Sequence, residues 1–365
     1  MPLLEPNYYG WWIGKQTAKG TPNLTPTYRP IMVAGDFNIA RDDGDENYSD
    51  LTKYGARTDW VNSLLGNAEP GCEATPAELA YLLWLFHGGE TVTAEASVVG
   101  PPVVPAMSRH RFTPSTTLGH PFTSFLRVGS SVIRRHQFND CYITRLAIES
   151  SSANKATRVT PRILSLDPAA IYAADPAASL PTDRPFLFTD ASQVGGAAAA
   201  TIDGSITIDG VTFRGITQFN VTIDDAWEPI YGDAATPFDF VQGQPVVNVA
   251  STVFFNTDGH ARFNSLVYGT PTPATGAKPI RSAVAANGSF KATLRQRDSA
   301  SAHSGRELVI DVPAVKWNVP DAPGPNPDGG VTELALAGTM RPPTGGAQPY
   351  TIDVKTAAAV AAFTV

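Results

Sequence analysis

The pattern of apolar and polar residues predicts short strands along most of the chain. One segment has the pattern of a helix instead. The stretch 27–40, TYRPIMVAGDFNIA, is rich in β-branched and aromatic residues and predicts a strand that leads into an acidic loop. Residues 79–86 are instead apolar almost without a break. Thr75 and Glu78 match the capping box that starts a helix, and Gly88 suits its end. Because the apolar residues go nearly all the way round, we expect a helix buried on most of its sides.

Four more strand-like runs and one interruption follow this helix. The runs lie at 108–114, 121–129, 141–149 and 156–164. The interruption at 169–197 is rich in Pro, Ala and Gly, and it predicts a linker.

The residues after this linker repeat the order of those before it. Three pairs of anchors share nearly the same separation: FNIARDD and FNVTIDD at 37–43 and 219–225, ITRLAIE and VTELALA at 143–149 and 331–337, and Gly88 and Gly269 after the two helix candidates. This pattern predicts two copies of one domain rather than a solenoid, whose period would be roughly 20–50 residues. The expected division is an N-terminal arm at 1–26, a first domain at 27–168, the linker at 169–197 and a second domain at 198–365.

Composition narrows the class of protein. The 365 residues suffice for two domains, and 31 Gly with 31 Pro favour turns between short strands. Charged residues make up 17% of the chain, below the roughly 25% of typical soluble domains, which suggests a surface partly covered by partners. The net charge of −7 argues against a generic polyanion binder.

No apolar run approaches the length of a membrane span, and the start MPLLEPNYYG lacks the features of a signal peptide. We therefore expect no membrane association and a chain that is cytosolic when it is made. Cys72 and Cys141 are too few for a disulfide scaffold and are expected to be buried thiols.

Candidate catalytic and nucleotide motifs are weak. The stretch 10–22, GWWIGKQTAKGTP, has only three residues between Gly10 and Gly14, and Gln16 separates its lysine from its threonine, so it is not a phosphate loop. The histidines form no zinc-binding pair, and Cys141 near His136 is expected to be a core thiol rather than a nucleophile. We expect no enzyme activity, cofactor or metal. A β-sandwich glycosidase, which needs only two carboxylates, is a remote alternative.

Acidic and basic residues gather in separate segments. The acidic loop holds Asp36, Asp42, Asp43, Asp45, Glu46 and Asp50, but without the glycine and glutamate spacing of a calcium loop. A basic segment carries Arg109, Arg111, Arg127, Arg134 and Arg135. Such a chain can stack head to tail on copies of itself, with the arginines as a basic partner face. Pairing within the chain, or plain solvation, is the equally open alternative.

The opening segment IGKQTAKGTP, the extended strand and long loop after it, and the later YGDAATPFDFVQGQPVVNVASTVFF resemble the major tail tube proteins of long-tailed bacteriophages. The resemblance spans most of the chain. It implies a mainly β fold with two tandem β-sandwich tail-tube domains, each with one flanking α-helix, whose inner sheets join into a closed multi-subunit β-barrel. It also implies an arm that docks on a neighbouring subunit through Tyr8, Tyr9, Trp11 and Trp12. Two long loops would reach the adjacent ring, carrying Asp42, Asp43, Asp45, Glu46, Asp50, Trp227, Tyr231, Phe238 and Phe240.

The same resemblance implies a structural virion protein that polymerises into a tail tube, a negatively lined conduit through which DNA passes without specific binding. With two domains per chain, we expect trimeric, pseudo-hexameric rings, with hexameric rings as the alternative. The expected partners are further copies of the chain, a tape-measure protein, and tail-tip and terminator proteins. The expected location is the virion tail, with the host cytoplasm during assembly. A tandem β-sandwich module that binds a receptor or glycan is the competing function.

Overall fold

The fold is mainly β and contains two short α-helices in the part of the chain that is described. The computed structural model describes residues 9–34, 37–44, 60–97, 105–115, 118–128, 133–154, 156–191, 204–213, 215–231, 237–243, 245–279, 287–297, 303–321, 332–342, 348–357 and Phe363.

The elements follow in chain order. The first part contains β1 (Tyr9–Lys15), β2 (Met32–Ala34), β3 (Phe37–Gly44), β4 (Trp60–Ala68), β5 (Gly71–Glu73), α1 (Pro76–His87), β6 (Thr91–Glu95), β7 (Met107–Phe112), β8 (Phe122–Val128), β9 (Arg134–Ser151), β10 (Arg158–Ile171) and a 3₁₀ turn at Phe188–Ala191. The second part contains β11 (Ser205–Ile208), β12 (Val211–Thr212), β13 (Ile216–Asp224), β14 (Trp227–Ile230), β15 (Asp239–Gln242), β16 (Val246–Phe254), α2 (Thr257–Tyr268), β17 (Asn287–Arg297), β18 (His303–Trp317), β19 (Glu333–Met340) and β20 (Thr351–Ala357).

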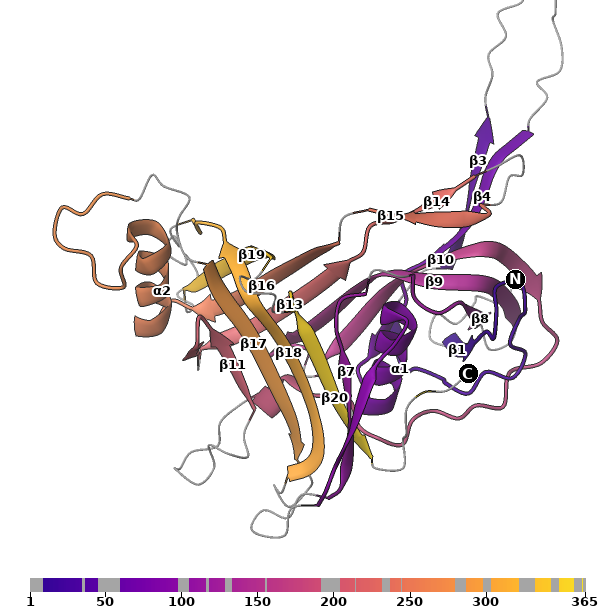
Figure 1. The fold of residues 1–365 in the computed structure, drawn as a ribbon, viewed down its shortest axis with the longest axis horizontal. Helices are drawn as coiled ribbons and strands as arrows, with labels where there is room; N and C mark the ends of the chain where they lie inside the picture. The colour runs from indigo at the N-terminus through magenta and orange to yellow at the C-terminus, as the bar shows by residue number, and fades with distance from the viewer. Residues whose placement is uncertain are drawn as a thin grey trace, which may run out of the picture.

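One curled antiparallel sheet contains every strand of the described residues except β14 and β15, which pair with each other (Figure 1). The long strand β9 joins its two parts. Residues 134–141 of β9 pair with β8, whereas residues 145–151 pair with β13. The resulting run β4–β10–β9–β13–β16–β19 passes from one part to the other without a break.

The same pairing pattern occurs twice. In the first part the strand order is β1–β8–β9–β10–β4–β3, and in the second it is β11–β17–β18–β19–β16–β13. The corresponding strands come in the same order along the chain, and each helix occupies the same place in that order. We call the two sets the first half and the second half.

One sequence match from the expected repeat is wrong. ITRLAIE lies in β9 and VTELALA overlaps β19, but β19 has the place of β10 in the pairing order. Both runs alternate apolar and polar residues because both strands bury one face, and this alternation is common to any such strand.

Helix α1 is the centre of the core, as its apolar sequence predicts. Every residue from Glu78 to His87 is buried, and the helix packs against β9, β7, β18 and β20 (Figure 1). Helix α2 lies at the far end of the molecule and buries only Gly259, Arg262, Asn264 and Leu266. The two helices therefore share a place in the pattern but differ in how much of their surface is covered.

The segment expected as a linker is packed rather than loose over its described residues, 169–191. Phe186 is fully buried in the core, and the carbonyl of Ala178 accepts a hydrogen bond from the Trp12 indole at 3.2 Å. Asp183 binds Arg306 of β18 with both carboxylate oxygens. This segment therefore ties the two halves together.

Candidate functional surfaces

The most extensive surface with a regular chemistry is one face of the central strands. Along β16, Val247, Val249 and Val253 point into the core, while Asn248 and Ala250 are exposed. The same alternation in β9, β10, β13 and β19 leaves one side of all five strands uncovered by the core. We call this side the open face.

Three rows of residues cross the open face, each residue directly opposite the next on the neighbouring strand. The middle row is Thr160, Ala147, Thr222, Asn248 and Thr339. The row on one side of it is Arg158, Glu149, Asn220, Ala250 and Ala337. The row on the other side is Arg162, Arg145, Asp224 and Val246. Short hydroxyl, amide and methyl groups dominate the rows in the second half, which makes that part of the face smooth and polar.

The charges of the open face are largely balanced within it. Arg145 Nη2 lies 2.9 Å from Glu69 Oε1, and Arg162 Nε lies 3.9 Å from the same oxygen. Arg158 stands directly opposite Glu149. Paired guanidinium groups attract phosphate less than free ones because the carboxylate cancels their charge. This arrangement can contact a polyanion without holding it.

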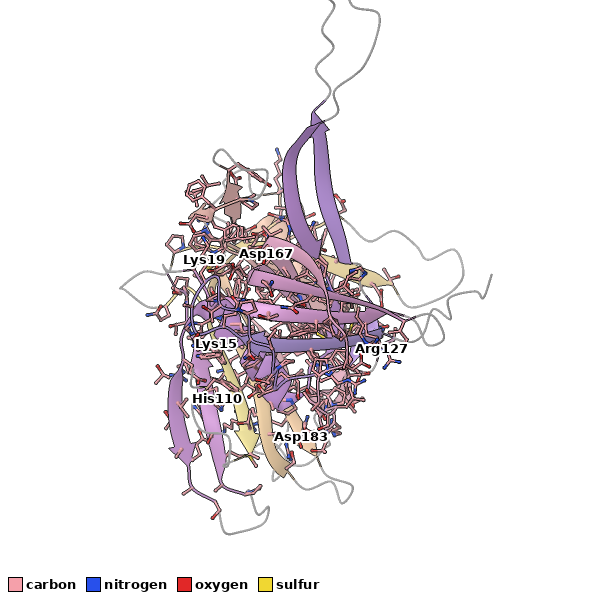
Figure 2. All side chains as sticks on the ribbon, turned by 90° about the vertical axis from the view of Figure 1, so that its right-hand side faces the viewer. Lys15, Lys19, His110, Arg127, Asp167 and Asp183 are labelled. Carbon is pink, nitrogen blue, oxygen red and sulfur yellow. The ribbon has the colours of Figure 1, made fainter. Side chains whose placement is uncertain are left out.

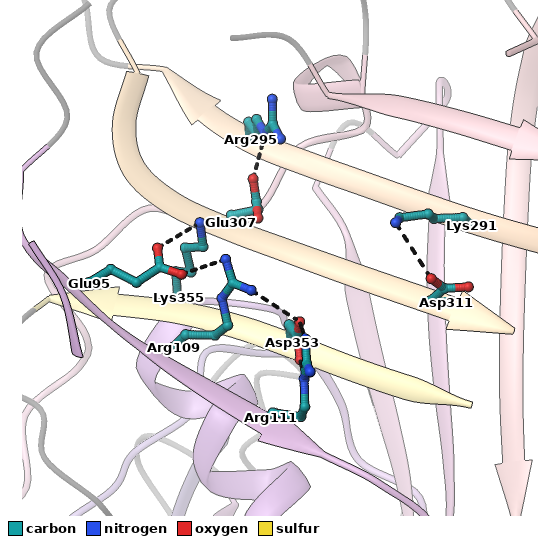
Figure 3. Close-up of polar contacts among 9 residues, drawn as sticks. All are labelled: Glu95, Arg109, Arg111, Lys291, Arg295, Glu307, Asp311, Asp353 and Lys355. Carbon is teal, nitrogen blue, oxygen red and sulfur yellow. Dashed lines mark hydrogen bonds and ion pairs between the residues drawn. The ribbon is translucent and has the colours of Figure 1, made fainter. Parts of the chain in front are cut away.

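A second surface is a ladder of ion pairs on the sheet formed by β6, β7, β20, β18 and β17 (Figure 3). Asp353 of β20 accepts two hydrogen bonds from Arg111 of β7, at 2.8 and 2.7 Å. Lys355 lies 2.9 Å from Glu95 and 3.4 Å from Glu307. The ladder therefore joins β6 and β7 to β17 and β18 of the second half through β20.

Two hairpins lie at one end of the molecule. The β3–β4 hairpin projects away from the body, as Figures 1 and 2 show from two sides. The β14–β15 hairpin instead folds back against the first half, where Phe240 packs with Tyr142, Leu164 and Leu166. The ring centroids of Phe240 and Tyr142 are 5.4 Å apart.

The expected loop residues are only partly described. Asp42 and Asp43 lie in β3 with side chains outside the described part, and Asp45, Glu46 and Asp50 lie outside it entirely. In the other loop, Tyr231 and Phe238 are exposed, Trp227 is half-buried and Phe240 is buried. The aromatic residues of the second loop are thus split between solvent and the first half of the same chain.

Trp11 and Trp12, which were expected in an arm docked on a neighbouring subunit, lie in the interior of their own chain. Both side chains are buried within the chain, and Trp11 Nε1 donates to Ser124 Oγ at 2.8 Å. The segment is strand β1, paired with β8 along its length, so the tryptophans fill the chain's own interior. Tyr9 belongs to the same strand with an undescribed side chain, and Tyr8 lies outside the described residues.

The arginines expected to form a basic partner face pair with carboxylates of the same chain where their side chains are described. Arg109 and Arg111 pair with carboxylates of the ion-pair ladder. On the other side of the first half, Arg127 and Arg135 both bind Asp175, at 2.5 and 2.7 Å. Pairing within the chain, the alternative left open above, accounts for all four; the side chain of Arg134 is not described.

Buried ionisable groups meet near the end of α1. His87 Nδ1 donates to the Leu83 carbonyl at 2.9 Å, because that oxygen can only accept, and His87 Nε2 then accepts from the Tyr350 hydroxyl at 3.1 Å. Burial lowers the pKa of His87 to about 4. Burial also raises the pKa of Asp225 to about 7, with Asp224 adding to the shift and a hydrogen bond from Trp227 opposing it. These groups are structural, since each is enclosed by protein.

Both cysteines lie in the interior of the chain. Cys72 and Cys141 are fully buried, and burial raises the pKa of both thiols, so the expectation of buried thiols is confirmed. No group of three or more His, Cys, Asp or Glu residues in the described ranges is placed to hold a metal ion.

The open face was missed by the sequence reasoning, although the signal was present. The runs 216–224, 246–254 and 333–340 alternate apolar residues with Asn, Thr and Ala. That alternation indicates a strand with one uncovered face.

No protein-family description matches this chain, and no curated protein is detectably similar to it. Within the described ranges, no helix combines the length and the apolar character needed to cross a lipid bilayer.

Proposed function

We propose that the chain is the repeating subunit of a phage-type tail tube, in which the open face lines the channel. The observation that carries the proposal is the curled sheet, built twice from one pairing pattern, with a continuous and nearly neutral polar face. In this assembly each half acts as one β-sandwich tube domain with its own flanking helix, and three chains supply the six domains of a ring.

The ends of the sheet support association between chains. Among the described strands, β3 pairs only with β4. At the other end, β19 pairs with β18 only over Gly338–Met340, so on the side away from β16 its stretch 333–336 borders no strand in the described part. Long unpaired edges invite pairing with another chain, and a closed barrel removes them. Head-to-tail contacts between different edges close into a ring when the rotation permits.

The chemistry of the open face suits a channel for DNA. A conduit must keep phosphates mobile, and unpaired cations would trap them. Here two arginines share Glu69, the third stands opposite Glu149, and Asp224 and Glu333 add negative charge. DNA would therefore pass along short polar side chains without specific binding. The other partners in this role are a tape-measure protein, tail-tip and terminator proteins, and the location is the virion tail.

Electron microscopy of the purified chain at rising concentration tests the proposal. Hollow tubes or stacked rings are the expected result, and averaged end views should show three-fold symmetry with six similar lobes. Dispersed single chains at every concentration and salt level would contradict it. Binding on a glycan array would then favour the receptor- or glycan-binding module, for which the exposed Tyr231 and Phe238 would be the first residues to substitute.

A further inference from the structure

Phe363 is held by side chains rather than by a strand or a helix. The residue belongs to no element of secondary structure, and its half-buried ring packs against the main core cluster. Four aromatic rings of the described part lie around it, with centroids between 5.1 and 5.9 Å from its own: those of Tyr28, Tyr81, Trp84 and His110. Such separations are favourable for aromatic pairs, whose centroids usually lie roughly 4.5–7 Å apart. We call these four residues the aromatic cage.

The aromatic cage is assembled from three parts of the chain. Tyr28 lies in the segment between β1 and β2, Tyr81 and Trp84 lie in α1, and His110 lies in β7. The rings of Tyr28 and Tyr81 are stacked, with centroids 3.6 Å apart. The Tyr81 hydroxyl also accepts a hydrogen bond from the main-chain N–H of Lys15 at 2.8 Å. The walls of the cage are therefore positioned by contacts with the rest of the chain.

A buried carboxylate completes the site. The Glu90 side chain is 4% exposed, and its two oxygens have different partners. Oε2 bonds with Nδ1 of His110, and Oε1 accepts a hydrogen bond from the main-chain N–H of Phe363 at 2.7 Å. His110 Nε2 bonds in turn with Thr356 Oγ1 at 3.1 Å. Loss of the Phe363 N–H would deprive Oε1 of this donor, and a buried acceptor without a donor is unfavourable.

The two contacts recognise different features of the residue in the site. The hydrogen bond to Glu90 needs a main-chain N–H, which every residue except proline has. The aromatic cage instead selects a flat ring. Peptide-binding sites divide recognition in this way, since main-chain hydrogen bonds supply affinity and pockets select side chains. The chemistry therefore matches a peptide segment that carries phenylalanine.

The repeated fold does not require this site. At the shared offset of 181 positions, Tyr81 and Trp84 of α1 correspond to Arg262 and Ser265 of α2 (262 − 81 and 265 − 84). Neither of these residues is aromatic, yet α2 forms a helix of the same length. The cage is thus an addition to α1 rather than a part of the repeated pattern.

The site is open on one side. Phe363 and Tyr28 are half-buried, whereas Tyr81, Trp84 and His110 are buried. The inner end of the site therefore contacts the core, and its outer end reaches solvent. Because residue 363 is in no strand, its ring can leave the cage while the sheet stays paired.

We propose that the aromatic cage and Glu90 form a peptide-binding site that recognises a phenylalanine residue by its ring and its main-chain N–H, and that Phe363 occupies this site as an exchangeable ligand of its own chain. A separate peptide with the same two groups binds when Phe363 is absent. Within the chain Phe363 competes strongly, because a tether of six residues from Ala357 (363 − 357) gives an effective concentration on the order of millimolar. This inference concerns a single chain and does not depend on the proposed tube.

Peptide binding to a chain that lacks the Phe363 ring tests the proposal. The probe is the peptide AAVAAFTV, residues 358–365, with para-fluorophenylalanine in place of its phenylalanine. Its fluorine NMR signal should shift when the complete chain carrying Phe363→Ala is added, because the rings of the cage then surround the fluorinated ring. The wild-type chain should bind the probe at least about tenfold more weakly, since its own Phe363 competes.

Phe255→Ala is the matched control. Phe255 is another half-buried phenylalanine that packs against the core, and its ring contacts are with His260 and Phe263. This variant also loses a phenylalanine ring, but its cage keeps Phe363. It should therefore bind the probe as weakly as the wild type does.

An ester analogue of the probe tests the contact with Glu90. The analogue has oxygen in place of the phenylalanine N–H and is otherwise the same, so only the donor is lost. It should bind the Phe363→Ala variant at least about fivefold more weakly than the probe does, because Oε1 of Glu90 is then left without a donor. Equal binding of the two peptides would contradict recognition of the main chain.

Thermal unfolding gives an independent measurement. Phe363→Ala should lower the midpoint, and a saturating amount of the unlabelled peptide should raise it again, because a ligand that binds only the folded chain stabilises it. The midpoints of the wild type and of Phe255→Ala should not change. If Phe363→Ala does not fold, Phe363→Leu replaces it, since leucine keeps an apolar side chain at the site and removes the ring. An unchanged fluorine signal with no recovery of the midpoint, or equal effects on all chains, would overturn the inference and leave the tube proposal as it is.

Discussion

Gly88 and Gly269 end the two helices in nearly the same backbone conformation, with φ 70° and ψ 5° in the first and φ 75° and ψ 6° in the second. Each N–H donates at 3.0 Å to the carbonyl four residues earlier, Trp84 in one helix and Ser265 in the other. The two glycines are 181 positions apart (269 − 88), as are the first residues of their helices (257 − 76). A residue with a Cβ atom is strained in this conformation, which explains why glycine occupies both places.

Replacing these glycines should affect the two halves differently. Gly88→Ala is expected to lower the free energy of unfolding by about 1 kcal/mol, because α1 lies in the shared core. Gly269→Ala should leave the urea midpoint nearly unchanged and speed hydrogen exchange in α2, which is covered on fewer sides. Gly89→Ala is the control, since a Cβ atom there meets nothing within 4 Å. Equal loss of global stability in both variants would contradict the difference in burial.

Helix α2 is held by a buried charge. Arg262 is 7% exposed, forms an ion pair with Asp209 and lies 5.6 Å from the centroid of the Trp317 ring. Burial lowers the pKa of Arg262 to about 10. Helix α2 therefore depends on Asp209 to compensate the charge of a buried guanidinium group.

Replacing Asp209 alone should lower the free energy of unfolding more than replacing Asp209 and Arg262 together. Asp209→Asn suits the left-handed backbone at this position, φ 54°, but leaves Arg262 unpaired, and a loss of about 2 kcal/mol is expected. Adding Arg262→Met to Asp209→Asn should recover at least half of this loss. Urea unfolding of the single and double variants measures both values. A double variant that is no more stable than Asp209→Asn would show that the pair does not couple.

Asp225 should make stability depend on pH in an unusual direction. Its folded-state pKa of about 7 lies above the ordinary 3.8, so between these values the folded protein keeps a proton that the unfolded chain has released. The free energy of unfolding is therefore expected to fall as pH rises from about 4 to 7, and to stay at the lower value above that.

Asp225→Asn should remove this part of the pH dependence. The expected gain at pH 8 relative to the wild type is about 4 kcal/mol or less, at 1.36 kcal/mol for each pKa unit. Urea unfolding at pH 5 and pH 8 provides the measurement, and Asp258→Asn, at an exposed carboxylate of α2, is the control. Parallel pH profiles for wild type and Asp225→Asn would contradict the buried, protonated carboxyl.

The nearly neutral charge of the open face is expected to affect only the retention of DNA. Thr222→Arg with Asn248→Arg places two unpaired cations in the middle row and is expected to make assembled tubes retain double-stranded DNA. Retention should fall with salt, because each phosphate contact lowers log affinity with a slope of about −0.9 against log salt. A filter-binding titration at several salt concentrations measures it. Lys291→Ala, on the face that carries the ion-pair ladder, should leave DNA retention unchanged, and binding by the wild type would argue against a channel.

Local structure was predicted well from the sequence, and long-range pairing was not. Pro76 and Gly88 mark the two ends of α1 because helix ends depend on neighbours within a few positions. The capping box was wrong in detail, since the Thr75 side chain makes no hydrogen bond to the helix backbone and binds the Glu78 carboxylate instead. The split pairing of β9, whose ends join different halves, depends on contacts that no local pattern encodes. The same limit explains why the burial of Trp11 and Trp12 within their own chain was not predicted. The sequence of an aromatic strand is the same whether its own chain or another chain covers it.

For the candidate surfaces, too, local features could be predicted from the sequence and long-range contacts could not. Alternation in 246–254 indicates one exposed side, but the row Thr160–Thr339 exists only after five strands are aligned. Opposite charges along the sequence were visible, yet Asp175 and Asp353 take up the arginines because folding brings them near. Residues 175 and 353 lie far from those arginines along the chain, so composition alone could not identify them as the partners of the arginines.

Strand β20 lies between β7 and β18, and it follows both of them along the chain. During synthesis on the ribosome, the surface of α1 that faces β20 stays uncovered until residue 357 has emerged. The contact between α1 and β20 is therefore expected to form late, since contacts this distant in sequence form slowly. In the proposed tube, a chain would therefore be expected to complete this contact before it adds to the polymer.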